Sequence, residues 1–280
     1  MVLESLIPIR AAEKEPIEML PLAFLYASIG IFVGYWIFPN YASLTSVFFT
    51  VIACIPLMIS FIRFEEKDIF KNNKKWHHQK AIPFFIFLFL GLVFAYSFWF
   101  VVFPKSLLSS VFGIQLDTIV QINNAISGSA TSISFFTPIL TNNLKVLMFC
   151  LLFSFVYGAG AIFILTWNAS VVSAAIGNAT RSLISKLAST TNLPGIAIYF
   201  SAFSLGLLRY LSHGIFEMIG YFLGGLAGGL ISVAVLRHDF LDENFRRVFI
   251  DALNIILVSI GVLIFAAIIE VTLSPLIPIR

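Results

Sequence analysis

Charged residues are scarce in this sequence of 280 residues. Asp, Glu, Lys and Arg together make up 11% of it, whereas a typical soluble domain contains about a quarter. Hydrophobic residues make up 59%, 31 residues are Phe, and the mean hydropathy is +0.99. A chain of this composition lacks the polar surface that a soluble protein needs, so we expect an integral membrane protein.

Cysteine is also scarce, and long polar loops are missing. Cys54 and Cys150 both fall within apolar runs, where Cys normally acts as a small apolar filler. We therefore expect no disulfide, metal or cofactor role for them. No loop is long enough for a soluble catalytic domain, so we expect no enzyme activity. The net charge of +3 fits anchoring at a membrane surface, and we expect no nucleic-acid partner.

Seven apolar runs are about long enough to cross a hydrocarbon core of roughly 30 Å as helices. They cover residues 21–38, 44–62, 81–103, 146–166, 193–211, 215–236 and 248–269. The sequence thus predicts an all-α polytopic membrane bundle with about seven transmembrane helices. The fifth and sixth runs are separated only by residues 212–214, so they could instead form one broken helix or a re-entrant pair.

The basic residues predict the orientation, because cytoplasmic loops carry an excess of Lys and Arg. With the N-terminus inside and the C-terminus outside, 13 of the 17 Lys and Arg residues fall in inside segments. These are Arg10, Lys14, Arg63, Lys67, Lys71, Lys74, Lys75, Lys80, Arg181, Lys186, Arg237, Arg246 and Arg247. The outside is left with Lys105, Lys145, Arg209 and Arg280.

The chain divides into a three-span segment (1–103), an outer loop (104–145) and a four-span segment (146–280). The first segment is rich in Phe and almost free of polar residues, which favours packing against lipid. Within the outer loop, apolar residues between Val111 and Ile126 lie near one helical face and predict a helix on the outer membrane surface. The Ser- and Thr-rich stretch around Pro138 is expected to be a loop packed on the bundle.

Glycines are concentrated in the four-span segment. Small residues let membrane helices approach closely, so we expect helix packing at Gly158, Gly160, Gly214, Gly220, Gly224, Gly225 and Gly228. We expect these contacts within one chain, with a homo-oligomer as the alternative.

Three polar residues interrupt the apolar sequence of this segment. Arg209, His213 and Glu217 are spaced by four residues, which places them on one face of a helix. Charged side chains persist in membranes when they pair, line a cavity or perform a function. Two interpretations remain open: a structural polar clasp that fixes two helices, or a protonatable or cation-binding pair.

The residues from 142 to 177 and from 212 to 229 resemble the stage II sporulation protein M family of membrane proteins over about residues 140–270. The matching positions are Asn142, Asn143, Lys145, Gly158, Gly160, Asn168, His213, Gly214, Glu217, Gly225 and Gly228. In spore-forming bacteria the family member is a membrane scaffold for peptidoglycan-degrading partners, and relatives occur in archaea without peptidoglycan. The resemblance adds Asn143 and Asn168 to the candidate site residues, and we expect both to face the bundle interior.

We therefore expect a multi-pass cell-membrane scaffold that recruits other membrane or envelope proteins or shapes the bilayer. The alternative is a channel or transporter that uses His213 and Glu217. An intramembrane metalloprotease is disfavoured, because His77, His78 and His238 all fall in inside loops.

Cysteine-accessibility labelling tests the orientation. Single cysteines at positions 72 and 244 should react with a membrane-impermeant reagent only after the membrane is opened. Labelling of either position from outside intact cells would show that the predicted topology is wrong.

Overall fold

The fold is described from a computed structural model, which places residues 15–72, 81–127, 132–157, 161–190, 194–237 and 243–273. Its helices are η2 (Pro16–Glu18), α2 (Met19–Ile37), η3 (Pro39–Tyr41), α3 (Ala42–Asn72), α4 (Ala81–Val102), α5 (Lys105–Ser127), α6 (Ser132–Tyr157), α7 (Ala161–Thr190), α8 (Gly195–Arg237) and α9 (Glu243–Thr272). The described residues are helical apart from short turns, which confirms the predicted all-α class.

Seven segments of the described chain are long and apolar enough to cross a membrane. They are Pro16–Ile37, Pro39–Ser60, Ile82–Val102, Phe135–Phe155, Ala161–Ser189, Gly195–Ser232 and Phe245–Thr272. The predicted number of spans is confirmed, but several predicted boundaries are not.

Two errors in the predicted spans cancel each other. Residues 193–211 and 215–236 do not form two spans, because α8 is one helix of 43 residues. The missing span is α7, a helix of 30 residues. Its Ser, Thr and Asn side chains lower the hydropathy of residues 167–190, so the sequence analysis read this segment as a loop. The predicted fourth span at 146–166 belongs to α6 only as far as Tyr157.

This correction moves the end of α7 to the other side of the membrane. If the N-terminus is inside, Arg181 and Lys186 lie outside, so the basic residues divide 11 to 6 instead of 13 to 4. The predicted inside still carries more Lys and Arg residues than the outside. The orientation of the termini stays a prediction.

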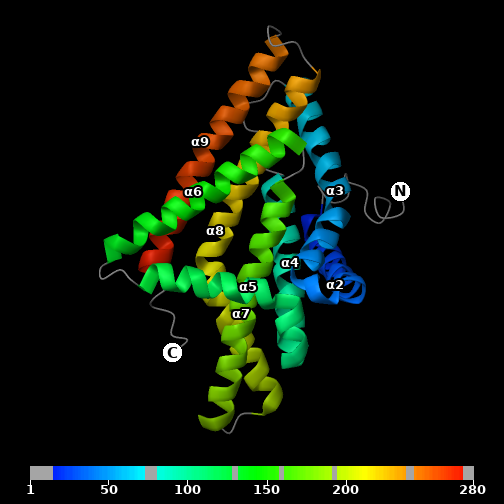
Figure 1. The fold of residues 1–280 in the computed structure, drawn as a ribbon. Helices are drawn as coiled ribbons and strands as arrows, with labels where there is room; N and C mark the ends of the chain where they lie inside the picture. The colour runs from blue at the N-terminus through cyan, green and yellow to red at the C-terminus, as the bar shows by residue number, and fades with distance from the viewer. Residues whose placement is uncertain are drawn as a thin grey trace.

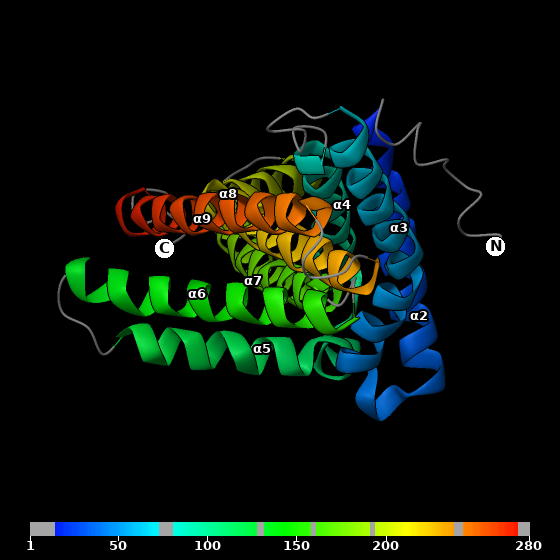
Figure 2. The same ribbon diagram turned by 90° about the horizontal axis from the view of Figure 1, so that it is seen from above.

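The helices pack as a bundle with two distinct sides. Figures 1 and 2 show α2 and α3 on one side and α6 and α9 on the other, with α4, α7 and α8 between them. α5 runs across the upright helices in Figure 1, and α7 and the beginning of α8 project beyond it. A helix of 43 residues is about 64 Å long at 1.5 Å per residue. It therefore exceeds the hydrocarbon core of roughly 30 Å, so part of α8 must lie beyond that core.

The stretch around Pro138 is not the predicted loop. From Ser132 onward it is helical, and Pro138 lies within α6. A proline removes one backbone donor and crowds the preceding turn. Pro138 is the seventh residue of α6, so fewer than two turns precede it and few helical bonds are affected.

The first three spans are not simply lipid-facing, contrary to expectation. Buried polar groups bond within them and to the rest of the bundle. Thr50 Oγ1 of α3 lies 2.9 Å from Tyr96 Oη of α4, which joins two of these spans. Gln115 of α5 donates through Nε2 to the Ser43 carbonyl of α3 at 3.1 Å and to Ser170 Oγ of α7 at 3.3 Å. These bonds fix α5 against α3 and α7.

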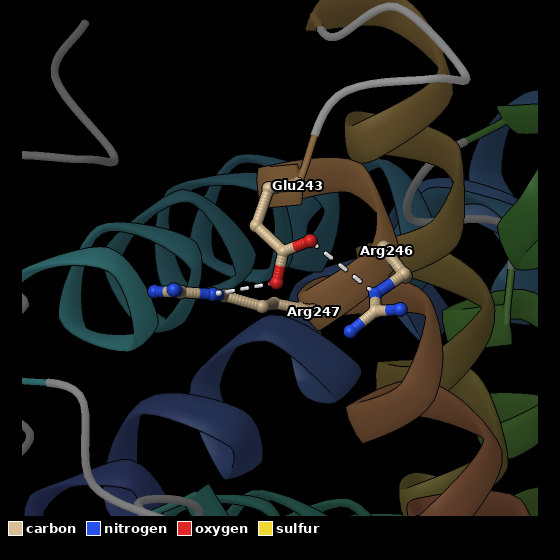
Figure 3. Close-up of polar contacts among 3 residues, drawn as sticks. All are labelled: Glu243, Arg246 and Arg247. Carbon is tan, nitrogen blue, oxygen red and sulfur yellow. Dashed lines mark ion pairs between the residues drawn. The ribbon is translucent and has the colours of Figure 1, made fainter.

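α9 begins with an ion-paired turn (Figure 3). Glu243 contacts Nε of Arg246 through Oε2 at 3.3 Å and Nε of Arg247 through Oε1 at 3.5 Å. An acidic residue in the first turn also interacts favourably with the helix dipole. All three side chains are more than half exposed, so these pairs contribute little to stability.

Two glycines of α8 allow α6 to approach closely. A methyl group added at Gly228 would lie 2.7 Å from the backbone oxygen of Leu151 in α6. A methyl group added at Gly224 would overlap the side chain of Leu147 in α6. Larger residues at either position would push α6 away from α8.

Other glycines of α8 face different neighbours. An added methyl group would lie 2.6 Å from Leu263 of α9 at Gly220 and 2.8 Å from Ala161 of α7 at Gly225. At Gly214 it would meet no described atom within 4 Å outside its own helix backbone. Gly214 therefore does not hold a neighbouring helix close, and its predicted packing role is wrong.

Two substitutions in α8 test this difference. Gly228→Ala should destabilise the protein by about 1–3 kcal/mol, because the new methyl group meets the backbone of α6. Gly214→Ala should be neutral or stabilising by up to about 1 kcal/mol, because alanine favours a helix and the position is open. Thermal unfolding of both variants in detergent measures the effect. Equal stability of the two variants would contradict the assigned packing.

Candidate functional site

α8 places the three predicted polar residues on one face. The helix continues through Gly214, so Arg209, His213 and Glu217 follow one another at intervals of four. Ser212, at the predicted break, donates to the carbonyl of Arg209 at 2.8 Å. Its hydroxyl is therefore satisfied within the helix, and the alternative of a broken or re-entrant pair is wrong.

Glu217 is bonded to an asparagine of α6. Asn143 donates through Nδ2 to Oε1 of Glu217 at 2.8 Å, and its Oδ1 accepts a hydrogen bond from the hydroxyl of Tyr221 at 2.8 Å. Asn143 and Tyr221 are both buried. The amide thus links two residues of α8 that lie one turn apart.

The second partner of Glu217 is Glu270 of α9, which the sequence analysis missed. The two carboxyl groups lie close enough to interact directly. Because ionised carboxylates repel each other and only accept hydrogen bonds, this contact is favourable when one of the two groups carries a proton. Glu270 is the one charged residue between positions 252 and 272. An isolated acid in an apolar run is the signal that could have identified it.

We call Asn143, Glu217, Tyr221 and Glu270 the polar clasp. It joins α6 to α8 and α8 to α9 through groups that satisfy one another. Hydrogen bonds between membrane helices contribute about 0.6 kcal/mol on average and up to about 1.7 kcal/mol. Removing one partner costs more, because it leaves a buried polar group unsatisfied. The clasp therefore fixes the register of three helices.

We predicted that His213 and Glu217 act together, and the contacts above involve only Glu217. His213 and Arg209 are half-buried and lie on the same face as Glu217. The partners that the structure gives to Glu217 come from α6 and α9, so a coupling between His213 and Glu217 stays a prediction.

The residues added by the family resemblance have different surroundings. Asn168 is half-buried and donates through Nδ2 to the carbonyl of Ile164 in its own helix at 2.9 Å. It does not take part in the polar clasp. Asn142 and Lys145 are exposed. Gly158 and Gly160 lie outside the described residues.

Cysteine and histidine side chains are common metal ligands. Cys54 and Cys150 are buried and free. In the described ranges, no group of three or more His, Cys, Asp or Glu side chains is placed to hold a metal ion. His77, His78 and His238 lie outside those ranges.

The seven apolar spans and the polar clasp between them define a polytopic integral membrane protein. The stage II sporulation protein M family matches residues 81–275, so the chain belongs to this family and the resemblance is confirmed. The match begins well before residue 140 and includes α4.

One relative aligns with this chain over most of its own length. A protein of Methanocaldococcus jannaschii, described as uncharacterised, is 31% identical over 175 residues, which cover 60% of this chain and 88% of that protein. No solved structure matches the chain.

Two neighbouring asparagines of α6 test the polar clasp. Asn143→Leu should destabilise the protein by about 1–3 kcal/mol, because Glu217 and Tyr221 each lose a partner. Asn142→Leu, at an exposed position of the same helix, should change stability by no more than about 0.5 kcal/mol. Thermal unfolding in detergent measures both. A loss of similar size at position 142 would show that Asn143 has no special role.

Proposed function

We propose that this protein is a non-enzymatic membrane scaffold. The observation that carries the proposal is the bonding of Glu217: its carboxyl group is engaged by protein groups of both α6 and α9. A transport site must exchange protein contacts for a hydrated ion or substrate. Here the polar atoms of the clasp bond to one another and hold helices together. This supports a structural role for the residues that the sequence singled out.

The family adds support for a role in recruitment. In spore formers the family member is a membrane scaffold for peptidoglycan-degrading partners. Because relatives occur in archaea without peptidoglycan, the role that the family shares cannot depend on peptidoglycan. We therefore assign this chain partners among other membrane or envelope proteins in the cell membrane, and no catalysis of its own.

α6 is the span on which we place the partner contact. Only 17% of the residues in the apolar stretch of α6 are buried within the chain, compared with 72% in that of α8. Leu144, Met148 and Leu152 repeat every four residues on it, and all are exposed. These side chains form one apolar stripe that the described part of the chain leaves uncovered, and lipid or a second membrane helix can cover it.

Proton or cation transport is the second candidate function, and one observation favours it. The carboxyl groups of Glu217 and Glu270 interact with each other between two apolar spans, and a close pair of acids can share one proton. Glu270 is also only two residues from the end of α9 and half-buried. A carboxyl pair of this kind can in principle take up and release a proton or a small cation.

One double variant separates the two functions. Glu217→Gln with Glu270→Gln keeps a hydrogen bond between the side chains but removes the exchangeable proton. A scaffold should tolerate this change. We expect cross-linking from a photoreactive residue at position 152 to a discrete membrane protein, at similar yield in the wild type and the double variant. Position 257 of α9, which is also exposed, serves as the control position.

Proton flux provides the complementary measurement. Wild-type protein in liposomes with an imposed pH gradient should leak no more than empty liposomes. Flux in the wild type that disappears in the double variant would replace the scaffold with the transporter. Cross-linking only to lipid at position 152 would contradict the placement of the partner contact on α6.

A further inference from the structure

A groove lies where α4 ends, between α5, α7 and the beginning of α8. Its cavity volume is about 580 Å³, within the range of sites that hold small ligands. The polar part of its lining includes Lys105, Arg181, Ser182 and Ser185, and the apolar part includes Phe100 and Leu116. The described residues that line it include no acidic side chain, so they give the groove two positive charges beside an apolar wall.

Arg181 is held in a fixed position in this groove. Its Nε donates to the Phe100 carbonyl at 3.2 Å, and its Nη2 donates to the carbonyls of Val101, at 3.0 Å, and Phe103. Its guanidinium carbon lies 5.8 Å from the centre of the Phe100 ring. These bonds satisfy carbonyl groups at the end of α4 that have no partner within the helix. They use Nε and Nη2 but leave the two hydrogens of Nη1.

Among the described residues, none neutralises the positive charge of the groove. The bonds of Arg181 go to neutral carbonyl groups, and within the described part of the chain no carboxylate pairs with it or with Lys105. Lys105 is the first residue of α5 and is exposed. Two cations with free donors, together with two serine hydroxyl groups, form a set that matches the oxygens of a phosphate group.

The place of the groove in the fold identifies the ligand more closely. It lies at the end of the span formed by α4, next to α5, which crosses the upright helices (Figure 1). Membrane-surface helices lie at the level of lipid headgroups. Its apolar wall would contact acyl chains, whereas a free phosphate would leave that wall uncovered. We infer that this groove binds an anionic phospholipid, with the headgroup phosphate between Lys105 and Arg181. This site is distinct from the polar clasp and does not depend on the proposed scaffold function.

Lipid binding can be measured on the full-length protein in detergent. Phosphatidylglycerol, phosphatidylcholine and inorganic phosphate are titrated separately, and the midpoint of thermal unfolding and the bound lipid seen by native mass spectrometry are recorded. We expect phosphatidylglycerol to raise the midpoint and remain bound, and the other two to have little effect. An equal effect of phosphatidylcholine would overturn the charge-based site. An equal effect of inorganic phosphate would overturn the lipid in favour of a free anion.

Two lysines provide the matched variants. Lys105→Gln should weaken phosphatidylglycerol binding about fivefold, since one basic residue near a lipid surface contributes about that factor. Lys186→Gln removes the same charge from an exposed position of α7 that does not line the groove, and should leave binding unchanged. Arg181→Lys keeps the charge but loses the multiple donors, and should weaken binding more than Lys105→Gln. Equal binding by the Lys105 and Lys186 variants would overturn the proposal.

Discussion

A membrane interior offers polar groups no water, so each polar atom there must bond to the protein itself. This constraint explains the bonding of Glu217, whose carboxyl group would be costly if it faced hydrocarbon. A related need is met at the end of α4, where the guanidinium group of Arg181 bonds to carbonyl groups that have no partner within the helix. In both places a polar side chain from a later helix satisfies groups on an earlier one. The bundle is therefore held by bonds between residues that lie 70 to 80 positions apart.

Composition and hydropathy were sufficient for the coarse features of the fold. The scarcity of charge predicted a membrane protein, and the apolar runs predicted seven spans. Hydropathy failed where polar side chains sit inside helices. α7 contains Ser170 and Ser173, which bond to carbonyl groups of their own helix. Each hydroxyl is thereby satisfied without water, but a hydropathy sum cannot register that bond and reads the segment as a loop.

The sequence predicted which site residues share a face of one helix, but it did not predict the contacts between helices. The spacing of His213 and Glu217 on one helical face follows from sequence alone. Asn143 was selected through the family resemblance, since nothing in its local sequence indicates that it meets α8. Glu270 was missed because its role depends on the approach of α9 to α8. The separation of two spans predicted at residues 212–214 was wrong for a related reason: a glycine weakens a helix, but the fold around it decides whether the helix ends there.

Gly224, Gly228 and the part of the polar clasp around Asn143 belong to one interface between α8 and α6. On α6, Asn143, Leu147 and Leu151 are spaced by four residues and therefore share a face. Asn143 meets Glu217 and Tyr221, while Leu147 and Leu151 meet the glycines at positions 224 and 228. Residue numbers increase together along the two helices from one contact to the next, so α6 and α8 run parallel. Because the bond from Asn143 to Glu217 is only 2.8 Å long, a side chain at position 224 that displaced α6 by one ångström would break it. The close approach allowed by the glycines is thus the condition under which a carboxyl group of α8 can be satisfied from α6.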